Sequence, residues 1–166
     1  HTPSFEIDPD ATFIPVNGLA KMAEAANGYT IVGSGKTAID ACLWLLENGV
    51  DPDRIRWIRP RDSWLLDRMA FQPLKLVTNL IEAFSLATEA SADAEGIDDL
   101  IARLEASGQL RRIDPTVKPT MFRSATVSTS ELEALRTIEN VVRLGHVRHT
   151  GPDTISHYNL YRTAEI

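Results

Sequence analysis

A β-branched run that meets two closely spaced glycines limits the folds open to this chain more than any other segment. Residues 29–38 read Tyr-Thr-Ile-Val-Gly-Ser-Gly-Lys-Thr-Ala. The apolar run predicts a strand, and Gly33 permits a sharp turn at its end. Gly35 lets the backbone approach a diphosphate, and Ala38 occupies the third small-residue position of G-x-G-x-x-[GA], where it lets a helix pack closely on the strand. The segment therefore predicts a strand, a glycine turn and a helix that together form an anion site.

The stretch after this turn has the periodicity of an amphipathic helix and a marked end. Gly49 and then Pro52 follow the last periodic position, as is typical of a helix C-terminus. The apolar positions recur at spacings of three and four, and they are Ala38, Ala41, Cys42, Leu45 and Leu46. Residues 55–59, Ile-Arg-Trp-Ile-Arg, predict a second strand. The order indicates a βαβ unit with a right-handed crossover. Its helix N-terminus, with unpaired N–H groups and a positive dipole end, favours a pyrophosphate.

The residues after the second predicted strand bear on which dinucleotide would bind. At this place an acidic side chain accepts a hydrogen bond from the ribose 2′-hydroxyl of NAD, whereas an arginine accommodates the 2′-phosphate of NADP. Arg59 and Arg61 flank Pro60, and guanidinium groups bind phosphate oxygens with charge-assisted hydrogen bonds. We therefore predict NADP, and Asp62 leaves NAD as the alternative. The other interpretation of the two arginines is that they are solvated loop residues.

The same residues contain Gly-Ser-Gly-Lys-Thr, which invites comparison with a P-loop. The pattern G-x-x-x-x-G-K-[ST] would place its first glycine at Thr30, inside the apolar run. We also expect no apolar strand that ends in an aspartate able to hold magnesium. Nucleotide hydrolysis is therefore kept as a minor alternative. Lys36 is expected near the helix N-terminus, where it touches phosphate or points to water.

Residues 29–68 resemble the pyridine-nucleotide-binding part of flavin-dependent oxidoreductases similar to flavin-containing monooxygenases. Residues 119–128, Pro-Thr-Met-Phe-Arg-Ser-Ala-Thr-Val-Ser, and 141–148, Val-Val-Arg-Leu-Gly-His-Val-Arg, fit the same resemblance. In that family an NADPH domain is inserted in a larger FAD domain, and NADPH reduces the flavin. The resemblance implies that Arg59 and Arg61 lie near the adenosine end of the cofactor. It implies that the diphosphate is contacted by Gly33, Ser34, Gly35, Lys36, Thr37 and Ala38.

The FAD fingerprint of that family has no counterpart in this sequence, which begins with His1 rather than Met. We therefore expect a fragment of a larger flavoprotein with two dinucleotide domains, inactive by itself. Its expected function is to bind NADP(H) and to position the nicotinamide for hydride transfer to FAD held elsewhere in the protein. No side chain is assigned a catalytic role, because the cofactors carry the chemistry. A non-catalytic Rossmann-like module that senses nucleotide or mediates assembly is the alternative.

The expected fold is α/β, with a Rossmann-like βαβ core and a helical insertion. The expected segments are an irregular lead-in over 1–28, the βαβ unit over 29–68, a mostly helical insertion over 69–139, and completing strands with a tail over 140–166.

Finer patterns divide the second half of the chain. Periodicity and turn residues predict helices over 76–90 and 97–106, a loop over 115–128, and strands over 141–144 and 147–150. The sequence Ser130-Glu131-Leu132-Glu133 is interpreted as a capping box that opens a short helix extending to about Glu139.

Composition narrows the class of partner and the compartment. The formal net charge of −6 disfavours nucleic acid. Apolar runs stay well short of the ~20 residues that span a bilayer, so a cytoplasmic protein without a membrane partner is expected. Cys42 is the single cysteine and lies on the apolar helix stripe, which predicts a buried structural thiol. The spacing of His146, His149 and His157 matches no standard zinc pattern, so no metal site is predicted.

Overall fold

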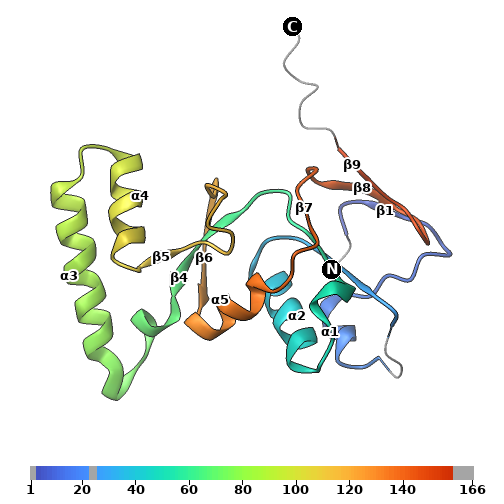
Figure 1. Ribbon diagram of the computed structural model, residues 1–166, viewed down its shortest axis with the longest axis horizontal. Coiled ribbons are helices and arrows are strands. Elements are labelled where there is room, and N and C mark those ends of the chain that lie inside the picture. Colours follow the sequence, from blue (N-terminus) through green and yellow to red (C-terminus); the bar gives the residue numbers. More distant parts are fainter. Residues whose placement is uncertain (1–2, 23–25, 159–166) are drawn as a thin grey trace, which may run out of the picture. The chain divides into compact units, whose positions relative to one another are not determined.

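The computed structural model describes residues 3–22 and 26–158 (Figure 1). Within them the chain has a mixed α/β structure with three small three-stranded sheets. It divides into two compact units. The first unit comprises His1–Arg61 and Thr137–Ile166, and the second comprises Asp62–Arg136.

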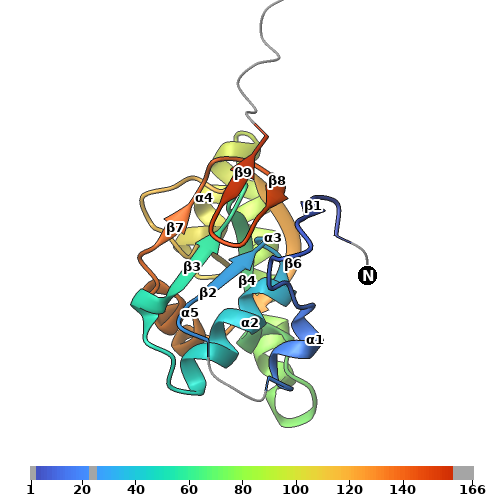
Figure 2. The same ribbon diagram turned by 90° about the vertical axis from the view of Figure 1, so that its right-hand side faces the viewer.

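A parallel sheet forms the centre of the first unit. Its strands are β2 (Tyr29–Val32), β3 (Ile55–Ile58) and β7 (Val141–Val142), in the order β2-β3-β7. The helix α2 (Lys36–Glu47) connects β2 to β3, and Figure 2 shows the three strands alongside one another. The predicted strand, helix and second strand are therefore confirmed. Each could be predicted because a contiguous run of residues forms it.

The helix α2 buries most of one side in the core of the first unit. The predicted apolar stripe is confirmed except at Leu46, which is only half-buried. The N–H of Gly49 donates to the carbonyl of Leu46 at 3.0 Å, which closes the last turn at the expected glycine. The buried positions of the helix are Ala38, Ile39, Ala41, Cys42, Leu43 and Leu45. From the sheet, Ile55 and Trp57 are fully buried.

A second sheet of the first unit joins a segment that precedes β2 to segments that follow β7. The strand β1 (Glu6–Ile7) runs parallel to β8 (Val147–Thr150), which pairs antiparallel with β9 (Ile155–His157). A short helix, α1 (Val16–Leu19), follows β1. The expectation of an irregular lead-in was thus incomplete, because the partner of β1 lies at the other end of the chain. The predicted strand over 147–150 is confirmed, the one over 141–144 is shorter than expected, and the tail from residue 159 lies outside the described residues.

The second unit contains its own sheet, in the order β5-β4-β6. Its strands are β4 (Ser63–Asp67), β5 (Leu110–Arg111) and β6 (Met121–Val127). Strand β4 is parallel to β6 and antiparallel to β5. The predicted loop over 115–128 was wrong over half of its length, where β6 forms. Residues 63–67 and 121–127 make strands because they pair with each other, at a sequence separation that local patterns do not reveal.

Three helices complete the second unit: α3 (Val77–Asp93), α4 (Ile97–Ala106) and α5 (Thr129–Arg136). The predicted helices over 76–90 and 97–106 are confirmed. None of the helices in the described part of the chain has the length and apolar character that crossing a membrane requires.

The helix α5 begins with a capping box, but two residues earlier than predicted. The N–H of Glu131 donates to Ser128 Oγ at 3.2 Å, and the N–H of Ser128 donates to Glu131 Oε2 at 2.7 Å. Arg68 Nη1 lies 2.7 Å from the other carboxylate oxygen of Glu131. Partial burial acts to raise the pKa of Glu131, but the Ser128 N–H and Arg68 outweigh it and hold this pKa below its usual value. The helix ends at Arg136 rather than near residue 139.

Candidate functional site

The glycine turn after β2 forms two hydrogen bonds with the neighbouring strand β3. The N–H of Gly33 donates to the carbonyl of Ile58 at 2.9 Å, which extends the ladder between β2 and β3. The carbonyl of Gly33 accepts a hydrogen bond from Trp57 Nε1 at 2.8 Å. Gly33 has φ +124°, in the region that side chains rarely adopt. The fold itself therefore requires a glycine at position 33.

Gly35 differs from Gly33, because neither its backbone conformation nor its packing against the described residues requires a glycine. It is the N-cap residue of α2 with φ −88° and ψ 177°, a conformation open to most residues. A Cβ atom added to it meets no atom within 4 Å. A Cβ added to Gly33, by contrast, would lie 3.7 Å from the Cβ of Ala38. The turn thus leaves free space at Gly35, whereas a side chain at Gly33 would be in van der Waals contact with Ala38.

The first turn of α2 presents donors without acceptors. The N–H groups of Ala38 and Ile39 donate to the carbonyl of Gly35 at 3.0 and 3.1 Å. Among the described residues, those of Gly35, Lys36 and Thr37 meet no acceptor, and no side chain caps the helix. Three N–H groups at the positive end of a helix dipole favour an anion.

Side chains near this turn leave it accessible. Ser34 and Lys36 are half-buried and Thr37 is exposed. Lys36 Nζ forms an ion pair with Asp40, one helical turn along, and both side chains reach solvent. Such exposed pairs are weak. The structure therefore brings together, at one helix end, the six residues that the sequence assigned to a diphosphate.

The two predicted arginines occupy different environments. Arg59 is buried, with 2% of its surface exposed, and its guanidinium carbon lies 4.7 Å from the centre of the Trp57 ring. Arg61 is exposed. The interpretation of both arginines as solvated is therefore wrong for Arg59, because the indole of Trp57, two residues back on the same side of the chain, covers its guanidinium. Asp62, the alternative ribose ligand, is buried and belongs to the second unit.

Cys42 is a buried thiol, as the apolar stripe predicts. Burial raises the pKa of Cys42 to about 12, and the nearby positive charge of Arg59 opposes this shift only in part. A thiol with such a pKa stays protonated and unreactive at neutral pH. Cys42 therefore has a packing role next to Arg59.

The three histidines of interest are dispersed. His149 Nε2 lies 3.2 Å from Asp8 Oδ1, and His157 Nδ1 lies 3.2 Å from the carbonyl of Gly145. Within residues 3–22 and 26–158, no group of three or more potential metal ligands comes together.

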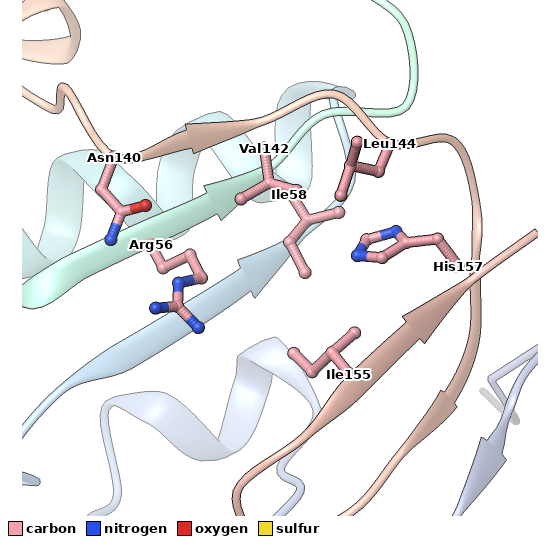
Figure 3. A pocket seen from close by; sticks show the side chains of 7 residues that line it. All are labelled: Arg56, Ile58, Asn140, Val142, Leu144, Ile155 and His157. Carbon is pink, nitrogen blue, oxygen red and sulfur yellow. The ribbon is translucent and has the colours of Figure 1, made fainter.

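A groove in the first unit involves residues that the sequence did not single out. Its volume is about 280 Å³, and it lies over β3, β7 and β9 (Figure 3). Its lining consists of Arg56, Ile58, Asn140, Val142, Leu144, Ile155 and His157. An exposed arginine inside an apolar strand was the only local signal. Apart from Ile58, the residues that line the groove with Arg56 come from positions 140–157, far along the chain.

Comparison with known proteins gives relatives without a described function. No family model matches this sequence, and no solved structure matches it. An uncharacterized protein of Mycobacterium bovis and two uncharacterized proteins from strains of Mycobacterium tuberculosis are each 47% identical to it over 152 residues. Each match covers 91% of this chain, which spans 28% of the length of each relative. The similarity assigns neither a ligand nor a reaction.

Proposed function

We propose that the first unit is the NADP(H)-binding module of a flavin-dependent oxidoreductase similar to flavin-containing monooxygenases. The observation that carries the proposal is the free space at Gly35. Neither the backbone nor the packing requires glycine there. A bound group that lies against the backbone would explain why this position has no side chain. Three N–H groups of the same turn meet no acceptor in the described part of the chain, which favours an anion as that group.

The order of the strands supports a Rossmann-like arrangement. In such folds the first three strands lie in the order 3-2-1, all parallel, and the phosphate-binding turn follows the first strand. Here β7, β3 and β2 are parallel neighbours in that order, and the glycine turn follows β2. The ligand then lies at the carboxyl ends of the strands, where ligands of open α/β sheets bind.

Each residue of the turn has a role in this proposal. The N–H groups of Gly35, Lys36 and Thr37 donate to the diphosphate, and Ser34 adds a hydroxyl donor. Lys36 exchanges Asp40 for a phosphate oxygen, since its present ion pair is exposed and weak. Arg61 is the exposed guanidinium that receives the 2′-phosphate, while the buried Arg59 supports Trp57 from within the unit.

The chemistry belongs to the cofactors in this proposal. NADPH supplies a hydride to FAD, and the chain binds the nicotinamide nucleotide and orients it. FAD is held by a part of the protein outside this chain, and the greater length of the relatives is compatible with such a part. In a full-length protein, NADPH then bleaches the flavin. Binding without bleaching would favour the non-catalytic module instead. Release of phosphate that depends on magnesium would favour a nucleotide hydrolase, although Thr30, the first P-loop glycine position, lies within β2.

The arginine pair gives the test of cofactor identity. We expect Arg61→Ala to weaken NADPH binding by about 1.5–3 kcal/mol, the range for a hydrogen bond to a charged group, and to leave NADH binding nearly unchanged. Arg59→Ala is the matched variant: it should lower the free energy of unfolding by about 2 kcal/mol, because a desolvated cation–π contact is lost. Calorimetric titration with both nucleotides and urea unfolding measure these effects. An equal loss of NADPH and NADH affinity in Arg61→Ala would show that the 2′-phosphate binds elsewhere.

A further inference from the structure

The groove over β3, β7 and β9 lies on one face of β3, and the helix α2 packs on the other face. Side chains alternate along a strand, so Arg56 and Ile58 share one face of β3, and Ile55 and Trp57 share the other. The Arg59 guanidinium lies over the Trp57 ring. Its positive charge also acts on the thiol of Cys42, which belongs to α2. The face of Trp57 is therefore the α2 face, and the groove opens on the other one (Figure 3).

The polar groups of the groove are available to a ligand. In the part of the chain that the structure describes, the guanidinium of Arg56 and the side-chain amide of Asn140 form no hydrogen bond or ion pair, and both residues are exposed. His157 Nδ1 lies 3.2 Å from the carbonyl of Gly145, so this nitrogen carries the proton. The other ring nitrogen, Nε2, then has a free lone pair and accepts a hydrogen bond in the neutral imidazole.

These polar groups lie at two ends of the groove. Figure 3 shows Arg56 and Asn140 toward one end and the His157 ring toward the other. Between and around them are aliphatic side chains, namely Ile58, Val142, Leu144 and Ile155. A guanidinium beside an amide donor suits a carboxylate, and a lone imidazole acceptor suits a hydroxyl.

We propose that this groove binds a small carboxylate whose apolar chain ends in a hydroxyl group. Arg56 and Asn140 donate to the carboxylate, the aliphatic side chains enclose the chain, and His157 Nε2 accepts from the hydroxyl. The volume of about 280 Å³ is slightly below the ~300 Å³ at which sites for drug-sized ligands begin, which restricts the ligand to a small metabolite. No lining residue belongs to the glycine turn, so this proposal does not rest on dinucleotide binding.

Three ligands of equal chain length separate the two polar contacts. The probes are ω-hydroxyhexanoate, which has both groups, hexanoate, which lacks the hydroxyl, and hexanediol, which lacks the carboxylate. We expect affinity to fall in that order in titrations followed by amide resonances of the labelled chain, with the shifts centred on the residues lining the groove. Equal binding of the three probes, or shifts centred elsewhere, would overturn the proposal, as would displacement of the probe by NADPH.

Variants of the lining residues test the same contacts. Arg56→Ala should weaken ω-hydroxyhexanoate by about tenfold or more, because a charge-assisted bond is lost, and Arg56→Lys should restore part of the affinity. His157→Phe should abolish the preference for ω-hydroxyhexanoate over hexanoate. Arg148→Ala, at an exposed arginine of β8 outside the groove, is the matched control and should bind as the wild type does. Wild-type affinity in the folded Arg56→Ala variant would overturn the proposal.

Discussion

At the residue scale, the environment of Cys42 makes the stability of the first unit depend on pH. Burial raises its pKa from 9.0 to about 12, so in the unfolded chain the thiol ionises first. The stabilising contribution of the protonated thiol is complete below pH 9, and it is lost as the pH rises toward 12. The free energy of unfolding should fall in this window by up to about 1.4 kcal/mol per pH unit from this group.

The variant Cys42→Ala isolates this effect. Its free energy of unfolding should decline less steeply than that of the wild type between pH 9 and pH 12, since the group that titrates is absent. Urea unfolding at a series of pH values measures both curves. Parallel curves for the two proteins would show that the thiol ionises equally in the folded and unfolded states.

Single residues also show where sequence patterns predict an environment and where they do not. The buried state of Cys42 followed from its position on a helical stripe. The burial of Arg59 did not, because arginines after strands are usually exposed. Trp57 and Arg59 lie two positions apart and therefore on one side of an extended chain, which would have been the available signal for their stacking.

At the element scale, the start of α5 depends on one hydroxyl group. Ser128 Oγ accepts from the N–H of Glu131, and the Glu131 carboxylate accepts from the N–H of Ser128. Ser128→Ala should therefore lower the free energy of unfolding by about 1 kcal/mol, the usual contribution of an N-cap. Ser130→Ala, at the position where the sequence pattern placed the cap, is the matched control and should have a smaller effect. Thermal unfolding of both variants decides between the two positions, and a larger loss in Ser130→Ala would contradict the capping geometry.

Elements were predictable where the signal is contiguous. The strand β2, the glycine turn and α2 follow one another within 19 residues, from Tyr29 to Glu47, and both the periodicity and the turn residues indicate them. Strand β6 was missed because it pairs with β4, 58 residues earlier at Ser63 and Met121, and its own residues include polar and exposed ones. The two-residue strands β1 and β5 carry no periodicity of their own.

At the scale of the whole molecule, the sequence indicated the α/β class and the βαβ unit, but it did not indicate the sheet of the second unit. Residues 63–67 follow β3 closely, and the sequence therefore grouped them with the βαβ unit. The structure places them in the sheet of the second unit, where β4 lies between β5 and β6. The groove could not be predicted for a similar reason, since Arg56 and His157 line one groove only after the two segments of the first unit have folded together.

A pair of valine substitutions tests whether the free space at Gly35 holds a ligand. Gly35 and Gly96 are both N-cap residues of helices, both have a backbone conformation open to other residues, and a Cβ at either meets no atom within 4 Å. Gly35→Val and Gly96→Val should therefore both fold, with thermal midpoints close to that of the wild type.

Calorimetric titration of the two variants with NADPH is the decisive measurement. Gly96→Val should bind as the wild type does. Gly35→Val should show no detectable binding, because the branched side chain occupies the space of the diphosphate. A folded Gly35→Val variant that binds NADPH with wild-type affinity would contradict the account.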